Sequence, residues 1–498
     1  MFRRRWSGLP ADPIFPSDFK ELGYFINEID EIRSVEHPDY YFKYYLTKND
    51  RWNERHRFAF NQAVAREIHA RLDAENFTII PLPLGTPATE PHVPVRASAN
   101  LATASSRVVI LFGESCQPLG VLAHRVIGGK GGVARGSVLS FVAALGAQPS
   151  SATDPSPPGI LLANAGELWW WPEGRCGLTP VDRHCVPMAS AVHVGRYHDP
   201  RLNEVEGNRT VGEHVKTVFE AVLAGGLVKE SAKLDIIAVG DTAEEVEKYL
   251  NDDKVWEKVG GKLGSMVVLG GCYSSKQFKC DGLTRFMEER ARAYIIHGAP
   301  LDTPLAGPGG NPSMVGLTSY GCPIFSAGGA KETETMLIEA QSAVLKWMKE
   351  VALKGEEYKN AVVEIFGDND NGSVAEDYDS WWGTAKGSDS AENDAEAQEN
   401  TTVASSGKEN EAAIQNNTDA GMGKVKDDTC EAHKNRGLGS VGVEYMPSNG
   451  EASQVLRTSL TNAGETEAHG EKVKPNNSFD AHDMKELVGE IEDMKIKH

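Results

Sequence analysis

The sequence predicts an α/β fold, with a mostly parallel sheet covered by helices on both faces, followed by a disordered acidic tail. Short apolar runs alternate with helical stretches between residues 107 and 353, and this alternation is typical of the βαβ units that build parallel sheets. Beyond residue 367 the composition changes to Ser, Asn, Asp, Glu, Gly and Thr, with few large apolar residues. Such a segment cannot bury enough surface to offset the entropy of ordering it, so disorder is expected there.

The predicted strands are short apolar runs without polar alternation, as expected of strands that helices cover on both faces. They are Val108–Phe112, Ile160–Ala163, Leu234–Val239, Met266–Leu269, Tyr294–Ile296 and Pro323–Phe325. The predicted helices are Ser137–Leu145, Val211–Leu223, Ala243–Leu250, Gly282–Arg292 and Glu332–Val351. The last of these repeats apolar residues at helical spacing, which indicates one buried face.

The first 77 residues are predicted to form an N-terminal helical extension of this domain. Ser17 and Asp18 are suitable caps for a helix that would begin at Phe19. A second helix is predicted over Asn53–Leu72, where apolar residues repeat on one side. Residues 81–106 are rich in Pro, Ala, Thr and Ser, which predicts an irregular connection or an inserted loop.

The formal charge of -20 is concentrated in the tail, because residues 368–498 hold 27 acidic and 12 basic side chains, a balance of -15. We therefore expect an α/β domain over 1–360, a disordered acidic low-complexity tail over 361–478 and a short amphipathic helix within 479–498. In that last segment apolar residues from Met484 to Met494 repeat at helical spacing. This pattern is typical either of a transient helix or of a helix that docks in a partner's groove.

Composition also opposes several functions. An acidic chain disfavours broad nucleic-acid binding, which needs clustered Lys and Arg to displace counterions. No apolar stretch approaches the ~18 residues of a membrane span, and the N-terminal residues lack the apolar core of a secretory signal. The seven cysteines are scattered without a CxxC pair, which favours a reducing compartment, the nucleus or the cytoplasm, over secretion.

The most informative segment is the strand that ends at Val239 and continues as Gly240-Asp241-Thr242-Ala243. A buried strand that turns sharply into a helix is where an α/β-hydrolase places its nucleophile elbow, and small residues suit so tight a turn. No serine is present around Asp241. Two interpretations of Asp241 remain: a nucleophile that forms an ester intermediate, or the favoured one, an N-cap of the following helix.

An Asp nucleophile would need a His in the loop beyond the last strand, and residues 326–334 contain none. The position expected for the acid, after the preceding strand, offers His297 and Asp302. We interpret His297 as a strand-end residue satisfied by hydrogen bonds, with a migrated base as the alternative. No catalytic residue is therefore expected. The alternative function is a hydrolase with Asp241 as nucleophile and His297 and Asp302 as its partners.

The segment Gly113-Glu114-Ser115 stands where a hydrolase has its oxyanion loop, because it follows the first strand of the alternating region. Glu114 would bring negative charge to a place that has to stabilise a developing oxyanion. Ser115 has no identifiable base, so we do not expect a free nucleophile there.

Trp169, Trp170 and Trp171 are consecutive, and three neighbouring tryptophans cannot all face one core. At least one of them should be partly exposed. The run is therefore either a lid over the edge of the sheet, or a protein-binding anchor or base-stacking platform.

Neither a metal site nor a cofactor is expected. Cys176, His184 and Cys185 lie near one another in the sequence but lack the spacing of zinc ligands. The glycine-rich segment Gly128–Gly132 lacks the spacing of a phosphate-binding loop, so we interpret it as a flexible loop.

Several blocks, in the same order along the chain, resemble the fungal Argonaute-binding (Arb-type) domain family. They are Phe2–Pro10, Asn27–Arg33, Trp52–Arg55, Phe112–Glu114, Ala163–Leu168, Val239–Asp241 and Ile324–Gly328. The likeness covers about residues 1–355 and leaves the tail outside.

The resemblance implies an α/β-hydrolase-like fold. The family includes a subunit of a fungal small-RNA chaperone complex that holds Argonaute with duplex small RNA, the C-terminal domain of class II histone deacetylases, and an animal nuclear regulator of co-transcriptional silencing. The animal members keep a Ser at the elbow, where this sequence has Asp241. By this analogy we expect a non-catalytic adaptor or scaffold in Argonaute-dependent silencing and heterochromatin formation, acting through protein–protein contacts.

Overall fold

The structure, a computed structural model, describes residues 8–193, 195–271 and 273–363. All of them belong to the first of the two units into which the chain divides, Met1–Ala385. The tail expected over 361–478 lies outside the described residues from residue 364 onward, as does the helix expected within 479–498. No described helix is long and apolar enough to cross a membrane.

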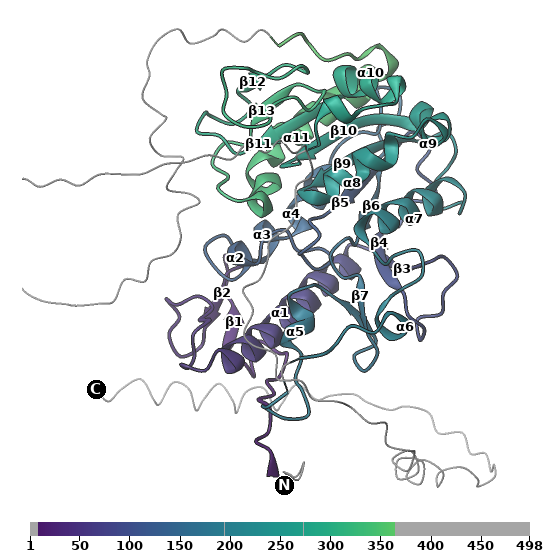
Figure 1. The fold of residues 1–498 in the computed structure, drawn as a ribbon. Coiled ribbons are helices and arrows are strands. Elements are labelled where there is room, and N and C mark those ends of the chain that lie inside the picture. Colours follow the sequence, from purple (N-terminus) through teal and green to yellow (C-terminus); the bar gives the residue numbers. More distant parts are fainter. Residues whose placement is uncertain (1–7, 194, 272, 364–498) are drawn as a thin grey trace, which may run out of the picture. The chain divides into compact units, whose positions relative to one another are not determined.

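A nine-stranded sheet runs through the domain (Figure 1). In chain order its strands are β3 (Thr78–Leu82), β4 (Val93–Ala97), β5 (Arg107–Phe112), β6 (Gly159–Ala163), β9 (Lys233–Val239), β10 (Leu263–Leu269), β11 (Ala291–Ile295), β12 (Pro304–Ala306) and β13 (Ile324–Ser326). Their order in space is β12-β13-β11-β10-β9-β5-β6-β4-β3. The six strands from β13 to β6 pair in parallel, whereas β12, β4 and β3 join antiparallel. The mostly parallel sheet that the sequence predicts is confirmed.

Helices cover both faces of the sheet (Figure 1). Their bounds are α1 (Asp50–Ala74), α4 (Val138–Gly146), α7 (Val211–Leu223), α8 (Asp241–Leu250), α9 (Asp253–Val259), α10 (Asp281–Arg290) and α11 (Thr333–Lys354). α1, α4 and α11 share one apolar core with Val109, Leu111 and Ile237 of the sheet. α7, α8 and α10 share a second core with the alternate residues Val108 and Ile110. Side chains of one strand alternate between the two layers because the side-chain period of a strand is two.

Smaller elements surround the edge of the sheet where the loops are long. Two antiparallel ribbons form, β1 (Tyr24–Ile26) with β2 (Ile32–Ser34) and β7 (Trp169–Trp171) with β8 (Cys176–Leu178). The short helices are α2 (His124–Ile127), α3 (Gly132–Gly136), α5 (Asp182–Cys185) and α6 (Pro200–Asn203), and 3-10 turns occupy Gly260–Lys262, Ser275–Gln277 and Gly355–Glu357.

Every strand and helix predicted between residues 107 and 353 is present, with ends shifted by at most three residues. The helix predicted over Asn53–Leu72 is also confirmed and extends further as α1, whose N-cap Asn49 accepts the N–H of Arg51 at 3.0 Å.

The helix predicted to begin at Phe19 is wrong. Asp18 does cap a turn there, since its carboxylate accepts the N–H of Glu21 at 3.0 Å. The chain leaves this turn at Gly23, whose φ of +80° lies in the left-handed region, and continues into β1. One turn does not propagate into a helix because nucleation costs more than a single hydrogen bond returns.

The irregular connection predicted over 81–106 is also wrong, because β4 and the end of β3 lie within it. The two strands pair with Pro81 opposite Pro94, and β4 also pairs with β6 through Arg96 and Ala97. The prolines hide the strand in the sequence, since Pro is usually confined to the edges of sheets.

Candidate functional site

The carboxyl ends of the parallel strands bring the predicted site residues to one edge of the sheet. Gly113–Ser115 follow β5, Ala163–Leu168 end and follow β6, Gly240 follows β9 and His297 lies just beyond β11. In open α/β sheets ligands bind in the crevice outside these ends, so we take this edge as the candidate site.

The turn from β9 into α8 is strained at Gly240. Its φ of +63° and ψ of -138° lie close to a region that only glycine occupies readily. Gly240 is the N-cap of α8 and Asp241 is the first helical residue. The interpretation of Asp241 as the N-cap is therefore wrong by one residue, and the strained centre of the turn is Gly240.

The neighbours of Gly240 also do not suit a nucleophilic side chain at this position. A Cβ at this position would meet Cγ of Glu114 at 3.1 Å and Cγ2 of Thr333 at 3.4 Å. A side chain here would therefore face a carboxylate and a methyl group. The sharp turn thus carries no side chain with which to attack a substrate.

Asp241 contacts the loop after β5. Its carboxylate accepts a hydrogen bond from the hydroxyl of Ser115 and a longer one, at 3.4 Å, from the Ser115 N–H. In a hydrolase the N–H groups of this loop point at the substrate's oxyanion. Here the Asp241 carboxylate accepts from the Ser115 N–H, so this N–H is not free for a substrate, and no histidine is hydrogen-bonded to the Ser115 hydroxyl among the described residues.

The surroundings of this contact are acidic. Burial, followed by the neighbouring Glu334, raises the pKa of the half-buried Glu114. Burial, followed by Glu114, raises the pKa of the Cys116 thiol to about 12. Glu334 itself accepts from Gln117 at 2.9 Å and pairs with Arg125. A protonated thiol is a poor nucleophile, and this field opposes the development of an oxyanion.

His297 and Asp302 are not assembled with Asp241. His297 is exposed, and its Nδ1 accepts the N–H of Ala299 within its own loop at 3.1 Å. Asp302 accepts from the Tyr294 hydroxyl at 3.2 Å. Among the described residues no hydrogen bond or ion pair joins His297 to Asp241 or to Asp302.

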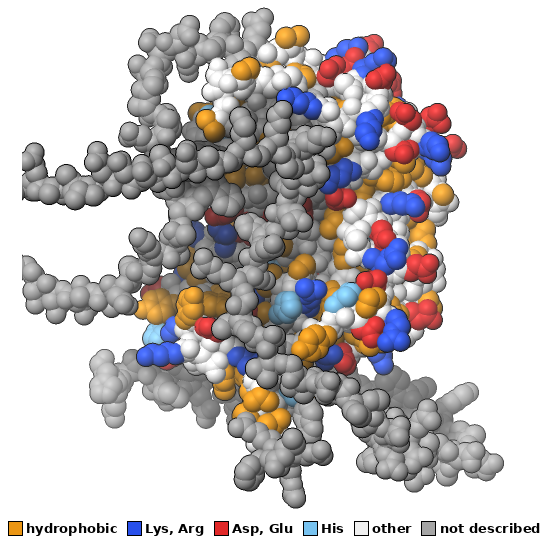
Figure 2. Space-filling view, in the orientation of Figure 1, with side chains coloured by type: hydrophobic (Ala, Val, Ile, Leu, Met, Phe, Trp, Pro, Cys, Tyr) orange, Lys and Arg blue, Asp and Glu red, His pale blue; other side chains and the backbone are white. Residues whose placement is uncertain are grey.

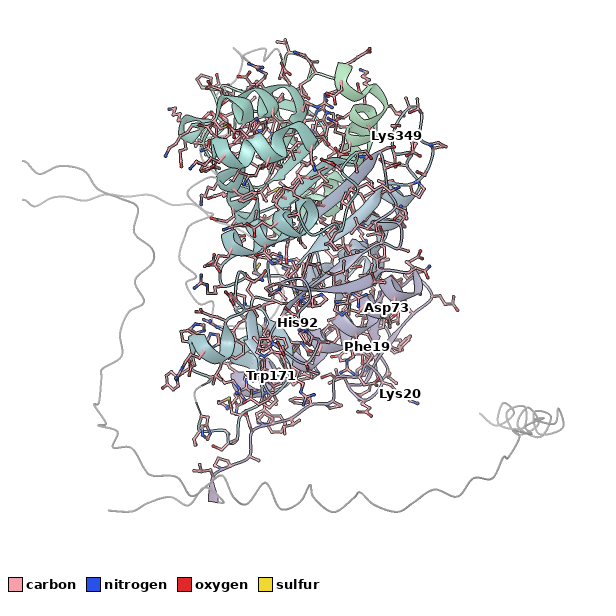
Figure 3. All side chains as sticks on the ribbon, turned by 90° about the vertical axis from the view of Figure 1, so that its right-hand side faces the viewer. Phe19, Lys20, Asp73, His92, Trp171 and Lys349 are labelled. Carbon is pink, nitrogen blue, oxygen red and sulfur yellow. The ribbon has the colours of Figure 1, made fainter. Side chains whose placement is uncertain are left out.

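The tryptophan run forms strand β7, so its side chains alternate in direction. Trp169 is 7% exposed and packs with Phe58 and Leu178, whereas Trp170 is 3% exposed and packs with Val93. Trp171 is half-buried, which confirms that at least one of the three is partly exposed; it lies in the lower half of the view in Figure 3. Two of the three rings are therefore parts of small apolar cores.

A cavity of about 370 Å³ opens beside Ser115, and no sequence motif predicts it. Its walls include Ser115, Leu168, Trp169, Arg183, Thr210 and Val211. These residues come from the loops after β5 and β6, from β7, from α5 and from the start of α7. No single motif spans them, so only the folded chain brings them together.

Buried polar groups hold the loops of this cavity in place. The N–H of Asn164 donates to Nε2 of His214 at 3.1 Å, and its side-chain amide donates to Glu167 at 3.0 Å. The same oxygen of Glu167 accepts the N–H of Leu119 at 3.0 Å. Burial raises the pKa of Glu167 to about 7 and lowers the pKa of His214 to about 3. The loops after β5 and β6 are thus joined through a carboxyl that titrates near neutrality.

The comparison with protein families is decisive for this chain. The family model described as the Arb2 domain matches residues 15–301, more than half of the sequence. This chain belongs to the Arb2 domain family. The Arb-type family inferred from the sequence blocks is thereby confirmed. No curated protein matches the chain.

The matched span of the Arb2 domain runs from before β1 to the loop after β11 and so includes the Gly240 turn, Ser115 and the cavity. Within the described part of this domain no three His, Cys, Asp or Glu side chains are placed to hold a metal. Cys185 donates to Glu54 and His184 accepts from Arg183, so both have other partners.

Proposed function

We propose that this protein is a non-catalytic adaptor in which the Arb2 domain binds a protein of Argonaute-dependent silencing or heterochromatin formation. In this proposal residues 1–360 are the binding domain, and 361–478 form an acidic tether ahead of a short helix in 479–498. The protein would act in the nucleus, the cytoplasm or both. The Arb2 domain match supports the link to silencing. The non-catalytic part of the proposal is supported by the residues around Gly240.

The observation that carries the proposal is the contact between Ser115 and Asp241. The Asp241 carboxylate occupies the Ser115 N–H, a loop donor of the kind that a hydrolase would offer to its substrate, beside a turn whose centre is Gly240. The strand order supports descent from such an enzyme. Numbered along the chain without β12, the strands lie in the order 1-2-4-3-5-6-7-8 with the second antiparallel, as in α/β-hydrolases.

A candidate surface for the partner lies on the N-terminal segment. Large apolar side chains are exposed there in an unusual concentration: Ile14 77%, Val35 56%, Tyr40 63%, Tyr45 69%, Leu46 41% and Trp52 44%. Figure 2 shows hydrophobic side chains at the lower left, over the β1–β2 ribbon. Exposed aromatic clusters are typical of protein interfaces. Over α7 to α9, on the right of the same view, basic and acidic side chains are interspersed, which favours a protein partner over nucleic acid.

The test is affinity purification of the tagged full chain from its own cells, with and without RNase, read by mass spectrometry. We expect an Argonaute or a chromatin-silencing protein that survives RNase. Replacing Tyr40 and Tyr45 with Ser should abolish its capture. The matched control is Tyr197→Ser, since Tyr197 is 94% exposed but lies outside this surface.

The same purified chain should release no product from a panel of esters. Ester hydrolysis that disappears in Asp241→Asn would overturn the proposal in favour of an Asp-nucleophile hydrolase. An RNase-sensitive partner would also contradict it, because the contact would then run through RNA.

A further inference from the structure

The cavity beside Ser115 has the size and the lining of a small-molecule site. Its volume of about 370 Å³ falls within the ~300–1,000 Å³ usual for ligand pockets, which are mostly apolar with a few convergent polar groups. Leu168, Trp169, Leu178 and Val211 supply the apolar wall. The remaining question is which polar group a ligand would have to carry.

Arg183 is a positively charged side chain in the wall of this cavity. Its Nε donates to Nε2 of His184 at 3.1 Å, and no carboxylate pairs with its guanidinium among the described residues. Of the other ionisable groups of the wall, Arg209 pairs with Glu213 at 2.6 Å, and Glu204 is hydrogen-bonded to Nε2 of His198 at 3.0 Å. A guanidinium with free terminal donors is the side chain best suited to hold a carboxylate.

The start of a helix lies in the same wall. α7 begins at Val211 in this wall, and its N-cap Thr210 accepts the N–H of Glu213 at 3.2 Å. The N–H groups of Val211 and Gly212 have no acceptor within the helix and favour an anion. The guanidinium of Arg183 and the start of α7 therefore both favour an acceptor that carries negative charge.

We propose that this cavity binds a small apolar carboxylate, with the carboxylate on Arg183 and the apolar body against Trp169 and Leu178. The proposal deepens the proposed function and rests on it in one respect, that the site holds its ligand without converting it. The adaptor would then carry a receptor site for a small acid.

The test compares two probes of the same shape, 4-phenylbutyrate and 4-phenylbutanamide, by calorimetric titration of the full chain. We expect the acid to bind at least ~10-fold more tightly, because only the acid carries the negative charge that a guanidinium binds, and tenfold corresponds to about 1.4 kcal/mol. Arg183→Gln should remove that preference. Arg66→Gln should keep it, since Arg66 is exposed on α1 and does not line the cavity.

A second variant tests the apolar part. Val211→Trp would fill the cavity and should abolish binding of both probes while thermal melting shows that the chain is folded. Equal affinity for acid and amide, loss of the preference in Arg66→Gln as well, or no binding of either probe would overturn the proposal. These titrations need no partner protein, so they succeed or fail independently of the affinity purification.

Discussion

Gly240 occupies the backbone position on which a nucleophile elbow depends. In an α/β-hydrolase the residue at this position has a strained backbone conformation, and the sharp turn exposes its nucleophilic side chain. This chain keeps the strained conformation but not the side chain, and the next residue, Asp241, points its carboxylate to Ser115. A side chain introduced at 240 would meet Glu114 and Thr333, and His297 is not among its nearest neighbours.

Gly240→Ala should destabilise the protein by about 1–3 kcal/mol, since Ala at this positive φ is strained and its Cβ would crowd Glu114. Urea unfolding measures the difference. Gly261→Ala is the matched control, because a Cβ there would meet nothing within 4 Å, and it should change the free energy of unfolding by less than about 0.5 kcal/mol. Equal effects of the two changes would contradict the assignment of strain to Gly240.

Glu167→Gln should become more stable relative to the wild type as pH rises from 5 to 8. Burial raises the pKa of Glu167 to about 7, so its contribution to stability is complete below its unfolded pKa and is lost as pH rises through 7. Gln cannot ionise, and its one oxygen can accept both hydrogen bonds that the same Glu167 oxygen accepts now. The difference between pH 5 and pH 8 should be on the order of 2 kcal/mol.

Chemical unfolding of both proteins across this pH range provides the measurement. Glu257→Gln, an exposed change on α9, should differ from the wild type by a constant amount. A Glu167→Gln curve that runs parallel to the wild type would show that Glu167 is ionised in the folded protein throughout.

At the scale of elements, the start of α8 and the loop after β5 are joined by one side-chain contact. In a hydrolase these two elements supply the N–H groups that bind the substrate's oxyanion, whereas here Ser115 and Asp241 are hydrogen-bonded to each other. The loop after β6 is fixed in the same way, through Glu167 and Leu119. The edge of the sheet is therefore held by internal bonds in the places where a catalytic site would keep its donors free for substrate.

A double-mutant cycle with Ser115→Ala and Asp241→Asn should give a coupling of about 1 kcal/mol, as expected of one hydrogen bond to a partly exposed carboxylate. Replacing Asp241→Asn by Asp253→Asn in the cycle should give a coupling near zero, because Asp253 lies in the first turn of α9. If the first cycle also gave no coupling, the contact would contribute nothing to holding the loop.

At the scale of the whole molecule, the sequence predicted the layers but not the edges. Runs such as Leu234–Val239 are predictable because a strand buried on both faces must be apolar throughout. β10 begins earlier than predicted since Gly264 and Ser265 interrupt its apolar run. β4 was missed because prolines occupy its register with β3, and only pairing with neighbours compensates for them.

The site was predictable in part. The position of the turn after Val239 is predictable, but φ is not visible in a sequence, so the sequence predicts Asp241 instead of Gly240 as the N-cap. The cavity was not predictable, because Ser115, Trp169, Arg183 and Val211 belong to separate segments. Alternation along β7 could have indicated that adjacent tryptophans face opposite sides, had that segment been recognised as a strand.

Asp12 connects the N-terminal segment to α1 and to the chain at Met188. Its fully buried carboxylate pairs with Arg51 and Arg55 of α1 and accepts the N–H of Met188 at 2.7 Å. Burial alone would raise the pKa of Asp12, but the hydrogen bonds from Arg51, Met188 and Arg55 outweigh it and lower the pKa. Its stabilising effect is thus complete at neutral pH. It is lost only as the pH falls below the pKa of Asp12 in the unfolded chain and then through its lower pKa in the folded protein.

Asp12→Ala should cost about 3–5 kcal/mol at neutral pH, because it leaves the 3%-exposed Arg55 charged and without its carboxylate. Asp18→Ala, which removes only an exposed turn hydrogen bond, should cost less than about 1 kcal/mol. Urea unfolding at pH 7 compares the two. A small loss of stability for Asp12→Ala would mean that this carboxylate does not fix the N-terminal segment to α1. Other contacts would then have to hold the candidate partner surface on that segment in place.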